Sequence, residues 1–350
     1  MKGIIQDLTK TQCIALAERL GEKKFRGTQL YEGLIAGKKI SEISTLSAAF
    51  KQTLLAEYED TAAEIVERLV SSDGTEKYLF RLADGNVIEG VLMKYKYGNT
   101  QCVSTQVGCR MGCKFCASTI GGLVRNLTRG EILSQVLAVN RLQGGTAKDR
   151  KVTNLVLMGS GEPLDNYEEV VGFLRLVSAE EGICISPRNI SLSTSGLAPQ
   201  MRALAEEGLS VNLTVSLHEP FDSERQEIMP IAKAYTVQEL LSACSYYFEK
   251  TGRRYIFEYT LIKGRNDSAR HANELVRLLR GRPCLVNVIR LNEVKESGLS
   301  ATTERDARAF ITLLEQGGLT ATLRRSVGSD IEGACGQLRR KYMETPQTLN

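Results

Sequence analysis

The chain has 350 residues, of which 42% are hydrophobic and 25% are charged, and its formal net charge is +4. These values are ordinary for a globular protein with a sizeable core and argue against long disordered tails. The weakly basic charge permits nucleic-acid binding through local patches without demonstrating it.

The amino terminus and the cysteine count indicate where the protein works. Residues 1–8 lack the apolar core of a signal peptide, and no apolar run approaches the length of a membrane span. Nine cysteines scattered through a long chain do not resemble a secreted disulfide framework. We therefore expect a cytoplasmic protein without membrane contact. No sequence feature bears on the oligomeric state, for which we expect a monomer.

Residues 1–60 are predicted to form a small helical domain, because apolar residues recur three or four positions apart in three segments. These segments are Leu8–Leu20, Gly27–Ile35 and Leu46–Leu55. Basic residues between them could contact phosphates, although a solvated surface is the more common explanation for any one of them. They are Lys23, Lys24, Arg26, Lys38 and Lys39.

Residues 61–100 show a period of two and are predicted to form an antiparallel β extension. Asp73-Gly74 and Asp84-Gly85 separate the three strand segments and are typical of hairpin turns. Glu89 lies inside the most apolar of these strands. Alternation along the strand predicts that its carboxylate faces solvent.

Residues 101–320 alternate strand and helix patterns and are predicted to form an open, incomplete parallel barrel of six βα units. The expected strands are Gln101–Val107, Asn154–Met158, Asn189–Ser195, Ser210–Ser216, Arg254–Ile262 and Leu285–Arg290. Ligands of such sheets lie beyond the carboxyl ends of the strands. The residues expected at that edge include Gly161, Glu162, Ser193, Ser216, His218 and Asn292.

Three cysteines, Cys109, Cys113 and Cys116, follow the first of these strands in Cys-x3-Cys-x2-Cys spacing. Gly112 allows a tight turn, so the spacing can bring three sulfurs onto one side of a soft-metal site. Structural zinc sites and fully protein-bound [4Fe-4S] clusters take four ligands. Three cysteines therefore fit a four-iron cluster with one open iron, a zinc site completed by His218, or buried thiols that bind nothing.

Gly161 and Glu162 follow the second expected strand. Glycine lets the backbone approach a ligand closely, and the carboxylate beside it can accept hydrogen bonds from an ammonium group. An ordinary turn with an acidic residue at a helix start is the alternative. An amino-acid-like ligand on the three-cysteine cluster would favour the binding interpretation.

Residues 321–350 form a C-terminal segment that carries Cys335 between two small residues. Such a loop would leave the thiol accessible, and the arginines around it would favour the thiolate. A free cysteine without a role is the alternative.

The cysteine motif, with Phe115 before its last cysteine, resembles the radical S-adenosylmethionine superfamily. Further motifs extend the resemblance over nearly the whole chain, to the RlmN-type adenine-C2 methyltransferases of ribosomal and transfer RNA. These motifs are Gln101–Cys109, Phe115–Thr119, Gly161–Pro163, Ser193–Gly196, Ser216–His218, Met229–Pro230 and Ala334–Leu338. Ser160 departs from the family, whose members often carry an apolar residue there.

The resemblance implies an open partial (β/α)6 radical SAM barrel whose N-terminal helices form an accessory RNA-binding domain. It implies a [4Fe-4S] cluster on Cys109, Cys113 and Cys116, with the fourth iron open to S-adenosylmethionine. The residues that match cosubstrate-binding positions are Gly161, Glu162, Ser193, Ser216, Leu217, His218 and Asn292.

The resemblance also implies a route to C2 of adenine, an electrophilic carbon that direct methyl-cation transfer does not suit. Cys335 would take a methyl group from one S-adenosylmethionine, and a radical made from a second molecule would activate that methyl group for addition to the adenine. Cys102 would then release the RNA by forming a disulfide with Cys335. Glu89 matches the proposed proton acceptor, which revises the solvent-facing expectation.

The implied partners are 23S ribosomal RNA, transfer RNA and an electron donor such as flavodoxin or ferredoxin. Two other functions stay open at this point. One is the C8 methylation of the related Cfr-type resistance enzymes, which share the cluster and the cysteine pair. The other is a non-catalytic iron-sulfur regulator that binds RNA.

Overall fold

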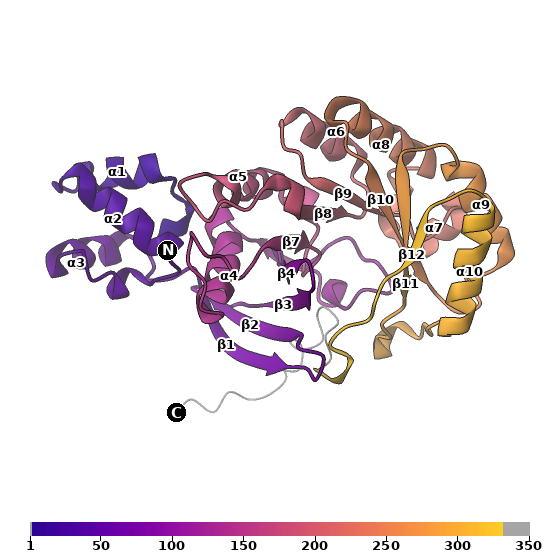
Figure 1. Ribbon diagram of the computed structural model, residues 1–350, viewed down its shortest axis with the longest axis horizontal. Coiled ribbons are helices and arrows are strands. Elements are labelled where there is room, and N and C mark those ends of the chain that lie inside the picture. The colour runs from indigo at the N-terminus through magenta and orange to yellow at the C-terminus, as the bar shows by residue number, and fades with distance from the viewer. Residues whose placement is uncertain (1, 332–350) are drawn as a thin grey trace.

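The structure, a computed structural model, describes residues 2–331. Its centre is a ten-stranded sheet in the order β1-β2-β3-β4-β7-β8-β9-β10-β11-β12, curved as Figure 1 shows. These strands are β1 Ala63–Val70, β2 Glu76–Leu82, β3 Val87–Tyr95, β4 Gly98–Cys102, β7 Asn154–Leu157, β8 Ile190–Thr194, β9 Asn212–Ser216, β10 Tyr255–Leu261, β11 Cys284–Arg290 and β12 Ala321–Leu323. A separate pair consists of β5 Gln106–Gly108 and β6 Leu123–Asn126.

The strands from β4 to β12 pair in parallel, and β1 to β4 pair antiparallel. The predicted partial barrel and its antiparallel extension are therefore confirmed. The sequence patterns missed β12, a short seventh parallel strand beside β11. Among the described residues, β1 and β12 end the sheet without pairing with each other, so the barrel is open there.

The single strand predicted over Gln101–Val107 is wrong, because the chain leaves the sheet after β4 and re-enters a different pair at β5. The amides of Thr105 and Gln106 both donate to the carbonyl of Ser160, at 2.9 and 3.1 Å. The backbone N–H groups of this segment thus donate to the loop after β7 instead of to a neighbouring strand. This detour holds the segment before the cysteine loop against the loop after β7.

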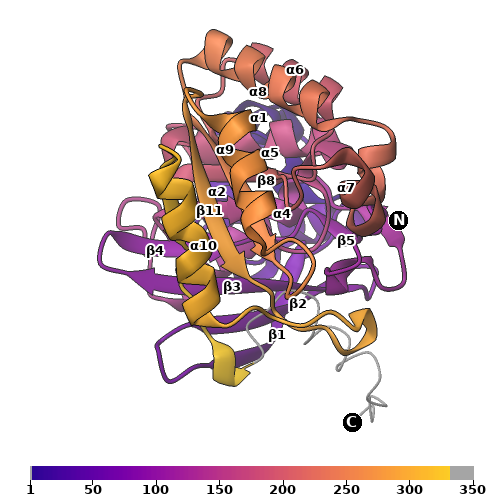
Figure 2. The same cartoon turned by 90° about the vertical axis from the view of Figure 1, so that its right-hand side faces the viewer.

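Helices cover the outside of the curved sheet, as Figures 1 and 2 show for α8, α9 and α10. They are α4 Arg129–Leu142, α5 Tyr167–Ser178, α6 Ala198–Glu206, α7 Asp222–Ile228, α8 Val237–Thr251, α9 Ala269–Leu279 and α10 Glu304–Gln316. Helices α4 and α8 begin with capping boxes, in which Thr128 and Thr236 accept from the amides of Glu131 and Glu239. No helix in the described part of the chain is long and apolar enough to cross a membrane.

The three predicted N-terminal helices are confirmed as α1 Lys10–Arg19, α2 Lys24–Ile35 and α3 Ala48–Glu57. They lie at one side of the sheet, beside β1 and α4 (Figure 1). One buried apolar cluster includes residues of these helices and of the barrel. The domain boundaries expected at residues 60, 100 and 320 stay predictions.

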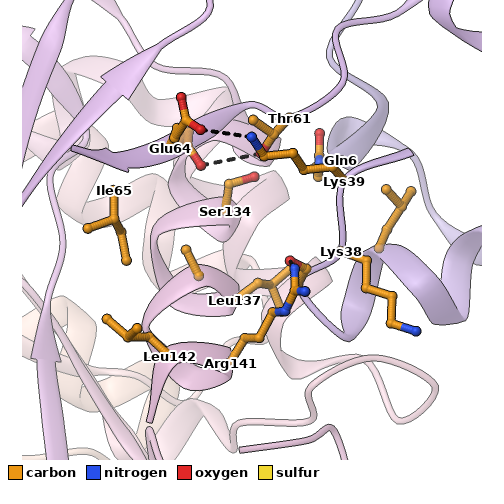
Figure 3. A pocket seen from close by; sticks show the side chains of 14 residues that line it. Gln6, Lys38, Lys39, Thr61, Glu64, Ile65, Ser134, Leu137, Arg141 and Leu142 are labelled. Atoms are coloured by element: carbon orange, nitrogen blue, oxygen red, sulfur yellow. Dashed lines mark hydrogen bonds and ion pairs between the residues drawn. The ribbon is translucent and has the colours of Figure 1, made fainter. Parts of the chain in front are cut away.

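A cavity of about 390 Å³ lies where the N-terminal helices meet β1 and α4 (Figure 3). Lys39 pairs across it with Glu64 on β1 at 2.7 Å, and Arg141 on α4 pairs with Glu42. The cavity is lined by none of the residues predicted for the site. Two of its three basic groups, Lys39 and Arg141, have acidic partners.

Candidate active site

The cysteine loop begins directly after β5 and is fixed at both ends by backbone hydrogen bonds. The amide of Cys109 donates to the carbonyl of Gly122 at 3.0 Å, and the amide of Lys114 donates to Ile228 at the end of α7 at 2.9 Å. Gly112 has a φ of +70°, which glycine adopts without strain. The loop is therefore held against α7 as well as against its own hairpin.

The charges of the three cysteines act on one another, so their sulfur atoms lie close together. Cys109 and Cys113 are buried, and Cys116 is partly exposed. Burial raises the pKa of the Cys109 thiol to about 12, and the charges of Cys116 and Glu162 add to the rise. Burial and the charges of the other two cysteines also raise the pKa of Cys113. Thiolates are therefore unstable here without a soft cation, and a metal cluster bound by sulfur fits this set of donors.

Gln106 joins the cysteine loop to the loop after β7. Its side-chain oxygen accepts from the amide of Glu162 at 2.8 Å, and its nitrogen donates to the carboxylate of Asp165 at 2.9 Å. Arg110, inside the cysteine loop, also donates to Asp165 at 2.9 Å. Gly161 has a φ of +108°, and a side chain there would come within 2.7 Å of the Gln106 amide. Only glycine fits this close approach.

Glu162 is buried and accepts hydrogen bonds through both carboxylate oxygens. The amides of Leu164 and Ser195 donate to it at 3.0 and 2.6 Å, so it links the loops after β7 and β8. Burial raises its pKa, and these hydrogen bonds partly oppose the rise. This geometry is compatible with an ordinary turn and also with ligand binding. A carboxylate oxygen that has one donor can still accept a second hydrogen bond from an amine.

His218 is buried after β9 with a φ of +55°, an unusual value for a residue other than glycine. Its Nδ1 accepts from the amide of Thr260 at 3.0 Å, and its ring meets the edge of Phe115 at a centroid distance of 4.8 Å. Burial and the charge of Arg225 lower its pKa to about 3, so the neutral ring carries its proton on Nε2. The ring thus offers no lone pair to a metal, which argues against the zinc alternative.

Arg225, on α7, was missed by the sequence analysis. It is fully buried, and it donates to the carbonyls of Ser195, Ser216 and Leu217 at 2.9 to 3.0 Å. Burial lowers its pKa to about 10, so it stays charged at neutral pH. No sequence pattern identifies this role, because the three carbonyls belong to loops that only the fold brings together.

Ser193 and Asn292 occupy less enclosed positions than Glu162. The Ser193 hydroxyl lies 3.4 Å from the carboxylate of Glu258 on β10, which also accepts from Arg324 at 2.9 Å. Ser216 is partly exposed and Leu217 is fully buried. Asn292 is exposed in the loop after β11. The predicted residues thus span the strand ends from β7 to β11.

Glu89 on β3 is only 4% exposed and lies 3.4 Å from the ammonium group of Lys77, which is also buried. The solvent-facing prediction from alternation was therefore wrong, because both faces of β3 are covered. Cys102 is buried on β4, opposite Val91 of the same strand β3. Cys335 lies outside the described residues, so its predicted pairing with Cys102 stays a prediction.

Comparisons with known proteins settle the family. A profile of the radical SAM superfamily matches residues 103–276. The chain is 49% identical over 343 residues to a probable dual-specificity RNA methyltransferase RlmN of Lachnoclostridium phytofermentans, covering 97% of this chain and 95% of that protein. The chain belongs to the RlmN family. An RlmN protein of Caldanaerobacter subterraneus is 48% identical, with 97% and 98% covered.

A solved structure supports the same assignment. The crystal structure of a radical SAM methyltransferase from Sphaerobacter thermophilus has a TM-score of 0.90 and 39% identity, covering 95% of this chain and 98% of that chain. This RlmN-family chain is thus an RNA methyltransferase of the radical SAM type, which uses a [4Fe-4S] cluster and S-adenosylmethionine. The predicted family, fold class and enzyme class are confirmed, whereas the roles of single residues are untested.

Ser160, in the loop after β7, carries a buried hydroxyl whose effect on stability can be tested. It is 4% exposed, and its hydroxyl has no hydrogen-bond partner among the described residues. A buried unpaired hydroxyl destabilises a fold. We expect Ser160→Ala to raise the free energy of unfolding by about 1 kcal/mol, measured by denaturant titration. The exposed Ser186→Ala serves as control and should change it by less than about 0.5 kcal/mol. A destabilised Ser160→Ala variant would contradict this account.

Proposed function

We propose that the enzyme methylates C2 of a specific adenosine in 23S ribosomal RNA and of adenosine in transfer RNA. Relatives with nearly the same length carry the name dual-specificity RNA methyltransferase. The observation that carries the proposal is the loop of three mutually close thiols beside the buried carboxylate of Glu162. This arrangement suits a cluster with one open iron next to a partner for an amino group.

Cys109, Cys113 and Cys116 would hold the cluster, which supplies the electron for reductive cleavage of S-adenosylmethionine. Glu162 would accept from the amino group of that cosubstrate, close to the glycine backbone of Gly161. The other residues proposed to bind the cosubstrate are Ser193, Ser216, Leu217, His218 and Asn292. Arg225 would position the chain at the ends of β8 and β9 through its hydrogen bonds to the carbonyls of Ser195, Ser216 and Leu217.

The adenine C2 atom is electrophilic, so the protein needs a carrier for the methyl group. We assign that role to the Cys335 thiolate, which becomes a thioether when it accepts the methyl group. Cys102 would release the methylated RNA by forming a disulfide with Cys335. Glu89 would accept the proton lost from C2, and its buried neighbour Lys77 would fix the position of the carboxylate.

The proposal extends to partners and location. The N-terminal helices α1 to α3 would contact the RNA, since exposed lysines such as Lys24 lie on them. A flavodoxin or ferredoxin would deliver the electrons, and the enzyme would act as a monomer in the cytoplasm.

The modified atom is tested by incubating the reconstituted enzyme, under anaerobic and reducing conditions, with ribosomal and transfer RNA. Mass spectrometry of the digested nucleosides should show 2-methyladenosine from both RNAs. Detection of 8-methyladenosine alone would replace the proposal with Cfr-type chemistry. Absence of both products and of 5′-deoxyadenosine would instead favour a non-catalytic RNA-binding regulator.

Replacing Cys335 tests the methyl carrier. We expect Cys335→Ala to keep its iron content and its cluster absorbance, because the residue is not a proposed cluster ligand. Methylation of RNA should fall to background, since no thiolate remains to accept the methyl group. Cys13→Ala, which removes a buried thiol in α1, is the control and should methylate like the wild type. Methylation by Cys335→Ala would contradict the carrier role.

Replacing Cys102 tests the release step. Without a second thiol, the covalent intermediate between Cys335 and the RNA cannot resolve by disulfide formation. We expect Cys102→Ala to accumulate a protein–RNA adduct, seen as a slowly migrating band that nuclease treatment removes. Turnover at the wild-type rate, without such a band, would rule out this role.

A further inference from the structure

A second group of metal-binding side chains lies outside the cysteine loop. Glu219 follows His218 after β9, Glu224 lies on α7, and His271 lies in the first turn of α9. One ligand atom from each residue falls within 4.8 Å of the other two, the one such group of three among the described residues. His271 Nε2 is 3.1 Å from Glu224 Oε2 and 3.7 Å from Glu219 Oε1.

Glu219 has no exposed surface, and its Oε2 lacks a hydrogen-bond partner in the described part of the chain. Its other oxygen accepts only a long bond, 3.4 Å, from the amide of Phe221. Burial raises the pKa of this carboxyl to about 8. A buried carboxylate without a full set of donors is costly, and a bound cation is one way to satisfy it.

His271 is oriented in the way that metal-binding histidines usually are. Its Nδ1 lies 2.7 Å from the hydroxyl of Ser268, and its Nε2 faces the two carboxylates. When Nδ1 donates its proton to Ser268, the Nε2 lone pair points toward Glu219 and Glu224. A hydrogen bond on the far nitrogen fixes both the tautomer and the ring direction of a metal ligand.

Glu224 is also anchored from behind. Its Oε1 accepts from Arg270 at 2.7 Å, which leaves Oε2 facing His271. Arg270 in turn covers the ring of Phe221 at 3.8 Å, closing one side of the group. Burial raises the pKa of Tyr259, and the negative charges of Glu219, Asp267 and Glu224 add to the rise. The charges of Arg270 and Arg265 oppose those of the carboxylates.

We propose that Glu219, Glu224 and His271 bind a divalent first-row transition-metal ion, separately from the cysteine loop. Two carboxylate oxygens and one imidazole nitrogen suit ions such as Mn²⁺, Fe²⁺ and Zn²⁺, with water completing the coordination. The ion ties the loop after β9 to α9. Since Glu219 adjoins His218, the ion holds that part of the active-site wall in place.

The test uses Mn²⁺ as the probe and the cluster-loaded protein as the sample. Mn²⁺ prefers oxygen and nitrogen ligands to thiolates, so it discriminates against the cysteine loop. Free Mn²⁺ gives a six-line electron paramagnetic resonance signal at room temperature that weakens on binding. The wild type should bind a single equivalent per chain, and its melting temperature should rise on saturation.

Glu219→Gln should lose this equivalent and the rise in melting temperature. Glu274→Gln, on the same helix as His271 but outside the group, is the matched control and should bind like the wild type. Circular dichroism establishes that Glu219→Gln is folded, and Glu224→Gln replaces it if it is not. Absence of Mn²⁺ binding by the wild type, or equal binding by the wild type and the folded variant, would overturn the proposal.

Discussion

The site depends on buried hydrogen bonds between loops that are far apart in the sequence. Gln106 and Glu162 join three of these loops through backbone amides and the carboxylate of Asp165, and Arg225 holds the carbonyl groups of Ser195 and Ser216. All of these groups would be costly to bury unpaired, so each partner stabilises the position of the next. The cysteine loop takes its place from this network.

Much of the fold follows from the sequence, because strand and helix periods, capping boxes and turn residues are local signals. The failures have a common cause. Glu89 was expected to face solvent because the alternation of apolar and polar residues assumes a strand with one buried face. In the structure both faces of β3 are buried. The break between β4 and β5 was missed because the amides of Thr105 and Gln106 donate to the carbonyl of Ser160, which lies much further along the chain.

The candidate site was also only partly predictable. The cysteine spacing and the strand ends identified Glu162 and His218, which the structure places beside the cysteine loop. The cysteine spacing alone could not exclude a zinc site, because zinc binding by His218 depends on which of its ring nitrogens already accepts a hydrogen bond. The amide of Thr260 occupies Nδ1, and this contact exists only in the folded chain. Arg225 carried no local signal at all.

The central claim is that three cysteines bind the cluster and leave one iron to S-adenosylmethionine. Electron paramagnetic resonance of the reduced, reconstituted enzyme tests it directly, with and without the cosubstrate. The account predicts that S-adenosylmethionine shifts the g values of the cluster and that the shift is lost when its amino and carboxylate groups are blocked. A spectrum that stays the same at saturating cosubstrate, with four irons per chain, would contradict it.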